Sequence, residues 1–225
     1  MMRCRICVEP GSGKGWTILR HDSSRLLFNY WNTIRKGRRA PDRSEIEPSD
    51  VRQILGDTFI LEVSMQLKTI SYRLAGTRLC AAHGRELKGL GYLALWREED
   101  NFEIARAVNL VYSEYQPILL AYAAMSAGER FVEYECILLP LLPAADGNAR
   151  VLGAATPKRP PYWLGSDPLM TNHLRSVRNI ESKDLAPLPE NEANIDPIPV
   201  VAQKLPRKMG HLTVFDGGLN TEKHN

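Results

Sequence analysis

The segment 130–141 constrains the fold more than any other part of this sequence. Apolar and acidic side chains alternate along it, with Val132, Tyr134, Cys136 and Leu138 on one side and Glu133 and Glu135 on the other. A period of two residues is typical of a β-strand that buries one face and exposes the other. The chain is therefore expected to build a sheet that contains this long strand, with the two glutamates on its solvated face.

Four shorter strand signals accompany the long one, at 58–63, 69–75, 117–124 and 151–156. The first two are close enough to form a hairpin, and turn residues flank the others. Between the second and third strands lie short helical turns over 77–96 and a longer amphipathic helix over 98–112. This order predicts an α+β fold, in which a five-stranded antiparallel sheet carries its helices on one face.

Further segments flank this pattern on both sides. The apolar residues of 24–36 repeat at helical spacing, and 168–180 is a second candidate helix. The glycine-rich start has no periodicity, and the proline-rich end has too few apolar residues to fold. The chain therefore divides into a flexible leader (1–20), a helical extension (21–57), a domain with a C-terminal helix (58–180) and a disordered tail (181–225).

The composition of the chain indicates where in the cell the protein is expected to be. No apolar run approaches the roughly 18 residues that a membrane span needs, and the first residues lack the apolar stretch of a signal peptide. The four cysteines among 225 residues are too few for a disulfide scaffold. These features predict a cytoplasmic protein without a transmembrane segment.

The sequence contains no recognisable set of catalytic or metal-binding residues. Cys4 and Cys7 form a C-x-x-C pair, but Cys80 and Cys136 supply no second pair for a zinc ribbon. The five histidines have no metal-ligand spacing, and His83 is expected to be a hydrogen-bonded surface imidazole. No serine lies in a G-x-S-x-G elbow. We therefore expect that the protein is not an enzyme and holds no metal.

Several short segments together resemble a known family. They are YRLAGTRLC (72–80), GRELKG (84–89), LLPL (138–141), LGAATP (152–157) and PYWLG (161–165), with YW (30–31), GRRAPDRSEIEP (37–48) and FILEV (59–63) upstream. In this order, over about residues 20–180, they are similar to an alphaproteobacterial family of PAS-fold proteins. The resemblance implies a sensory or regulatory module in signal transduction that acts on a partner protein such as a histidine kinase.

The resemblance also bears on cofactors. Flavin-binding PAS domains use a reactive cysteine in an Asn-Cys-Arg-Phe-Leu setting, whereas Cys80 lies in Arg-Leu-Cys-Ala-Ala. Haem-binding PAS domains place a histidine on the long helix, and 98–112 contains none. Flavin and haem are therefore disfavoured, and the identity of any ligand stays unknown.

The PAS pattern suggests where a small ligand would lie, between the long helix and the sheet. The pocket candidates are Tyr72, Arg73, Arg85, Glu86, Trp96, Ile104, Val108, Val111 and Tyr134. A fully packed core is the favoured alternative, because protein interiors rarely keep empty space. In that case the aromatic candidates are residues of the hydrophobic core, and Arg85 and Glu86 form an ordinary salt bridge.

The sequence contains two other candidate interaction surfaces. The stripe of the first helix, represented by Leu27, Tyr30, Trp31 and Ile34, suits either a homodimer or packing onto the protein's own sheet. Residues 1–44 hold ten Lys or Arg against three Asp or Glu. This basic segment offers an alternative function, the binding of nucleic acid or an anionic membrane. Nucleic acid is the less favoured partner, since basic tails are commonly just solvated.

Overall fold

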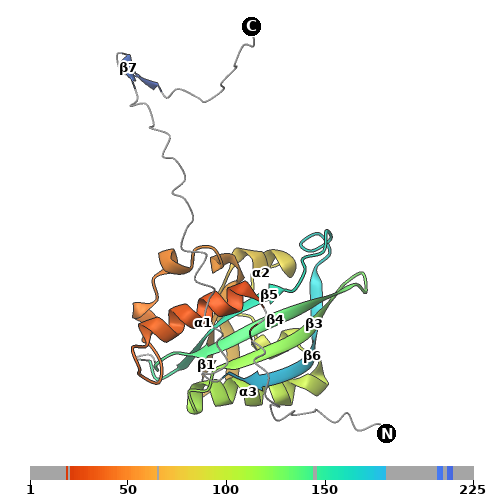
Figure 1. Ribbon diagram of the computed structural model, residues 1–225. Helices are drawn as coiled ribbons and strands as arrows, with labels where there is room; N and C mark the ends of the chain where they lie inside the picture. The colour runs from red at the N-terminus through yellow and green to blue at the C-terminus, as the bar shows by residue number, and fades with distance from the viewer. Residues whose placement is uncertain are drawn as a thin grey trace, which may run out of the picture. The chain divides into compact units, whose positions relative to one another are not determined.

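The fold is taken from a computed structural model, which describes residues 19, 21–64, 66–143, 146–180, 207–209 and 212–214. Its main unit is built on one six-stranded antiparallel sheet with the strand order β2-β1-β5-β4-β3-β6 (Figure 1). The strands are β1 (Thr58–Ser64), β2 (Thr69–Ala75), β3 (Ile118–Ser126), β4 (Phe131–Pro140), β5 (Ala149–Pro157) and β6 (Leu169–Asn179). The helices are α1 (Asp22–Ile34), α2 (Thr77–Ala82) and α3 (Asn101–Ser113), with short 3-10 helices η1 (Arg43–Glu45), η2 (Pro48–Val51), η3 (Leu55–Asp57), η4 (Tyr92–Leu95) and η5 (Glu98–Asp100).

A second unit covers 187–225. Its described part is a small antiparallel hairpin of β7 (Arg207–Met209) and β8 (Leu212–Val214). Apart from this hairpin, the predicted disordered tail (181–225) lies outside the described residues. The flexible leader (1–20) also lies outside them, except for Leu19, which is buried. None of the described helices has the length and apolar character needed to span a membrane.

The long alternating strand is confirmed as β4, next to the centre of the sheet. Its residues Val132, Tyr134, Cys136 and Leu138 belong to one core cluster, which also contains Ile104, Val108 and Val111 of α3. We call the sheet face that carries this cluster the inner face. The opposite, outer face is not simply solvated, because Glu135 is only 3% exposed and accepts a hydrogen bond from the His21 amide at 3.0 Å.

The helices of the predicted domain, α2 and α3, lie on the inner face as expected, whereas the N-terminal helix α1 covers the outer face. Leu27, Phe28 and Trp31 of α1 form a second core cluster with outer-face residues such as Ile137 and Leu152. Figure 1 shows α1 and α3 on opposite sides of the sheet. The sheet is therefore buried from both sides, and this explains why the end of β4 is apolar at every position.

The expected C-terminal helix over 168–180 is wrong, and the sheet has six strands rather than five. This segment forms β6, which pairs antiparallel with β3. The register shifts at Ala121/Tyr122 and Met125/Ser126, and each shift breaks the period of two. Apolar residues that share one face of the strand are therefore spaced unevenly in sequence, which imitates a helix. They are Leu169, Leu174 and Val177, which all join the inner core.

Candidate functional site

An unbroken series of aromatic rings fills the inner face. Neighbouring ring centroids lie 5.0 to 5.8 Å apart along the series Phe59, Tyr72, Tyr92, Trp96, Tyr122 and Tyr134. Burial raises the pKa values of the tyrosine hydroxyls well above their usual value of 10.0. Burial likewise raises the pKa of the Cys136 thiol among them. The inner core is thus an uncharged aromatic stack.

The space left inside this core is very small. A cavity of about 10 Å³ remains beside the rings, bordered also by Leu79, His83 and Leu87 from the α2 region. A volume of about 10–15 Å³ is the least that holds one water molecule. The inner core is therefore packed, and a larger ligand could enter only if side chains moved.

Two polar atoms around this cavity have no hydrogen-bond partner within the described part of the chain. They are the Trp96 Nε1 and the Asn172 Oδ1. Their residues are 5% and 3% exposed. A buried polar group without a hydrogen-bond partner has lost its contacts with water and gained nothing in their place. A molecule inside the cavity that formed hydrogen bonds with these atoms would therefore stabilise the core.

His83 is the cavity residue that sequence reasoning placed wrongly. It was expected on the surface, but it is buried, and its Nδ1 lies 3.0 Å from the Leu169 carbonyl oxygen. Burial lowers the pKa of this imidazole. The contact ties the end of α2 to the start of β6. No sequence signal marks this contact, because 86 positions separate the two residues.

The charged pocket candidates do not border the inner cavity. Arg73 forms an ion pair with Glu62 at 3.0 Å and so belongs with the outer-face residues. Arg85 and Glu86 are exposed and form no salt bridge with each other. Glu86 instead accepts hydrogen bonds from the Cys80 thiol and the Lys88 amide. The other candidates, Ile104, Val108, Val111, Tyr72, Trp96 and Tyr134, are buried inner-core residues.

The stripe of α1 packs onto the protein's own sheet. Leu27 is fully buried, and Trp31 is 2% exposed and donates its indole N–H to the Pro140 carbonyl at 2.8 Å. Tyr30 accepts a hydrogen bond from the Glu47 amide at 2.8 Å, and Ile34 is half-buried against the same cluster. Of the two alternatives for this stripe, the structure shows the intramolecular one.

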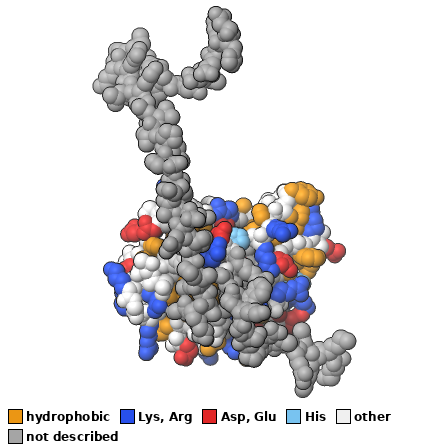
Figure 2. Space-filling view, viewed as in Figure 1, with side chains coloured by type: hydrophobic (Ala, Val, Ile, Leu, Met, Phe, Trp, Pro, Cys, Tyr) orange, Lys and Arg blue, Asp and Glu red, His pale blue; other side chains and the backbone are white. Residues whose placement is uncertain are grey.

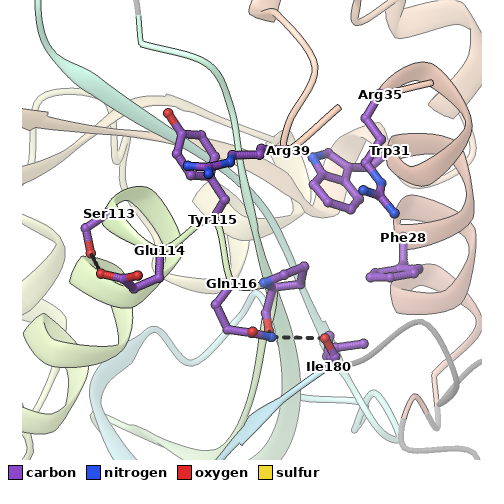
Figure 3. Close-up of a pocket in the computed structure, with 10 residues that line it drawn as sticks. Phe28, Trp31, Arg35, Arg39, Ser113, Glu114, Tyr115, Gln116 and Ile180 are labelled. Atoms are coloured by element: carbon purple, nitrogen blue, oxygen red, sulfur yellow. Dashed lines mark hydrogen bonds between the residues drawn. The ribbon is translucent and has the colours of Figure 1, made fainter. Parts of the chain in front are cut away.

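Next to α1 the outer face opens into a groove of about 520 Å³, here called the outer groove (Figure 3). It is lined by Phe28, Trp31, Arg35, Arg39, Ser113, Glu114, Tyr115, Gln116, Pro117 and Ile180. The Arg35 guanidinium lies over the Trp31 ring at 5.1 Å, and the Arg39 guanidinium over the Tyr115 ring at 5.8 Å. The sequence shows the basic character of residues 1–44 but not the groove, because the walls of the groove come from distant parts of the chain.

A third feature lies at the end of the sheet where the β3–β4 turn meets the β5–β6 connection. Three large apolar side chains are exposed here: Phe131 at 70%, Tyr162 at 94% and Met170 at 53%. We call them the hairpin-end patch. Figure 2 shows apolar side chains gathered on this end of the molecule, at its upper right. A group of exposed apolar side chains marks an interaction surface more often than a single scattered one does.

Asp167 holds the hairpin-end patch in place. Its carboxylate accepts hydrogen bonds from the Ser126 hydroxyl at 2.6 Å, the Gly128 amide at 3.2 Å and the Arg130 guanidinium at 3.0 Å. These donors lower the pKa of Asp167, the Ser126 hydroxyl most of all. Arg130 also lies over the Trp163 ring at 5.1 Å. The loop that carries Tyr162 is thereby fixed to the β3–β4 turn.

A comparison with family models agrees with this fold. A family model described as a PAS domain matches residues 19–156, more than half of the chain. Among solved structures, the chain is similar to that of an RNA-binding Light-Oxygen-Voltage receptor, at 15% identity and a TM-score of 0.33. That similarity covers 47% of this chain and 31% of the receptor chain, and no curated protein matches the sequence. The family match extends from Leu19, just before α1, through most of β5, and on this ground the chain belongs to the PAS domain family.

Proposed function

We propose that this PAS domain is a non-enzymatic regulatory module that works by binding another protein, a signalling protein such as a histidine kinase. PAS domains are sensory and regulatory modules, so the regulatory class follows from the family. The observation that supports a protein partner is the hairpin-end patch. Its side chains are exposed although the loop that carries Tyr162 is well ordered by Asp167.

The placement of the patch suits a docking surface. Phe131 on β4 pairs with Met125 on β3, and Met125 also pairs with Thr171 on β6. Because neighbouring strands lie about 4.8 Å apart, Phe131, Met125 and Thr171 form one row across three strands. Met170 precedes Thr171 in the sequence and so lies next to this row. Aromatic residues held in a fixed conformation bind partners well, because little side-chain freedom is lost on binding.

The test compares the proteins retained by variants of the full-length chain. Phe131→Ser combined with Tyr162→Ser removes the aromatic part of the patch, and Phe102→Ser is the matched control because Phe102 is 74% exposed on α3. Each tagged protein is incubated with extract of its natural host, and retained proteins are quantified by isotope-labelled mass spectrometry. We expect a signalling protein that the wild type and the Phe102 control retain equally, and that the double variant loses.

Two results would contradict this proposal. If no protein distinguishes the double variant from the Phe102 control, the patch is not the docking surface. If the retained protein is a nucleic-acid complex that nuclease treatment removes, the alternative function of the basic segment replaces the proposal.

Gating by a small polar ligand in the inner core is a second candidate function. It is favoured by the two unpartnered polar atoms around the cavity, those of Trp96 and Asn172. A ligand or water that bonds to both would link the end of η4 to β6. Flavin and haem stay disfavoured in this proposal, because the cavity has a volume of only about 10 Å³.

Native mass spectrometry of the full-length protein tests this second function. We expect a small bound mass, or a thermal stabilisation by a small hydrogen-bonding solute, that Asn172→Leu abolishes. Leu90→Met serves as a control, because Leu90 packs against the same core without lining the cavity. If Asn172→Leu changes neither the bound mass nor the response to any solute, the cavity has no ligand role.

A further inference from the structure

We propose that the outer groove binds a small organic anion, a molecule that carries a phosphate or carboxylate group. This site is separate from both the aromatic core and the hairpin-end patch. Its volume of about 520 Å³ lies within the range of about 300–1,000 Å³ common for small-molecule pockets. The aromatic side chains of Phe28, Trp31 and Tyr115 and a few charged groups line it, which is the usual mixture in such sites.

The two arginines provide the charge that an anion needs. Arg35 donates from Nε to Asn32 at 2.8 Å and from Nη1 to the Arg38 carbonyl at 2.9 Å, so other guanidinium hydrogens stay available. Within the described part of the chain, neither Arg35 nor Arg39 has an ion-pair partner, whereas Arg38 is paired with Glu45 at 2.6 Å. Arginine binds phosphate and carboxylate oxygens with two parallel hydrogen bonds.

Stacking holds both guanidinium groups in place. Arg35 and Arg39 lie over the faces of Trp31 and Tyr115, and Figure 3 shows these pairs on two sides of the groove. A guanidinium that is already positioned loses less freedom when it binds an anion. Tyr115 supports this reading, because its φ of 56° is unusual for a tyrosine. Glycine is common at such a position after a helix, yet the chain keeps the ring beneath Arg39.

The remaining polar groups of the groove restrict the ligand further. Gln116 is fixed by hydrogen bonds from its Nε2 to the Pro117 and Ile180 carbonyls, at 3.1 and 3.0 Å. Glu114 is the one carboxylate among the lining residues, and it accepts a hydrogen bond from Ser113 at 3.5 Å. Two guanidiniums against one carboxylate leave the groove positive. The preferred ligand therefore carries its anionic group toward an arginine and an uncharged or hydrogen-donating part toward Glu114.

The experiment uses the full-length chain with three simple probes: phenyl phosphate, benzoate and uncharged phenol. Binding is followed at low salt by NMR, through the indole N–H signal of Trp31, and by calorimetry. Arg35→Gln and Arg39→Gln remove one cation each. Arg85→Gln is the matched control, because Arg85 is also an exposed arginine without a described ion pair but lies outside the groove.

We expect an anionic probe to bind while phenol does not, and salt to weaken the binding. Each groove variant should lower the affinity about tenfold, and Arg85→Gln should leave it unchanged. Binding of phenyl phosphate alone would identify a phosphate site, and binding of benzoate alone a carboxylate site. The proposal is overturned if no probe shifts the Trp31 signal at about 10 mM, if phenol binds equally well, or if Arg85→Gln weakens binding as much as the groove variants.

Discussion

Trp31 offers the sharpest test of how this protein is built. Its ring is 2% exposed, lies at the centre of the outer-face cluster and donates a hydrogen bond to the buried Pro140 carbonyl. Trp31→Ala removes this ring from the core and should lower the free energy of unfolding by about 3–5 kcal/mol. Trp31→Phe keeps most of the apolar contact but leaves the carbonyl unpaired, which costs about 1–3 kcal/mol.

These losses are large compared with the total stability of a domain, about 5–15 kcal/mol. At this size each kcal/mol shifts the melting temperature by about 2–4 °C, so Trp31→Ala should melt about 6–20 °C lower. The assay is thermal unfolding followed by circular dichroism at several protein concentrations, with light scattering to give the mass. Thr33→Ala is the control, since Thr33 lies on the exposed side of the same helix.

We expect that Trp31→Ala lowers the melting temperature by an amount that does not depend on protein concentration, with no change in mass. If Trp31→Ala remained as stable as the wild type and only converted a dimer to a monomer, α1 would be packing against a second copy rather than against its own sheet.

Two further predictions concern the inner core. Because burial lowers the pKa of His83, the unfolded chain takes up its proton first, so the free energy of unfolding should fall as the pH drops below about 6.5. His83→Gln should reduce this slope in urea titrations between about pH 5 and pH 8, and an identical slope would contradict the assignment. Gly153→Ala should lower stability by about 1–3 kcal/mol in urea unfolding, because a Cβ there would lie 2.3 Å from the Phe59 ring. Gly91→Ala, whose Cβ would lie 4.0 Å from its nearest neighbours, should have a much smaller effect.

The order of the elements could largely be predicted from local patterns. The strand expected at 69–75 is observed as Thr69–Ala75, and the helix expected at 98–112 is observed as η5 followed by α3. In both segments the apolar spacing follows the period of the observed element. The spacing signal failed at β6, where two register shifts disturb the alternation, so the apolar spacing pointed to a helix.

The sites were less predictable than the strands, for a physical reason. Which face α1 covers depends on complementarity with Ile137 and Leu152, more than a hundred positions away. The outer groove exists only because Arg39, Tyr115 and Ile180 meet at one place. Neither arrangement leaves a local pattern in the sequence. Tyr72, Trp96 and Tyr134 were identified as core residues, whereas Phe59, Tyr92 and Tyr122 were not. The small volume left between the rings depends on ring orientations that no spacing encodes.

The position of α1 has a practical consequence for any shortened form of this protein. A fragment that starts at β1 would keep all six strands of the main sheet, with α2 and α3, yet would leave Ile137, Leu139 and Leu152 facing water. Such a strip of aliphatic side chains on a bare sheet promotes self-association. The smallest fragment that stays dispersed should therefore begin at or before His21, whose amide donates a hydrogen bond to the buried carboxylate of Glu135.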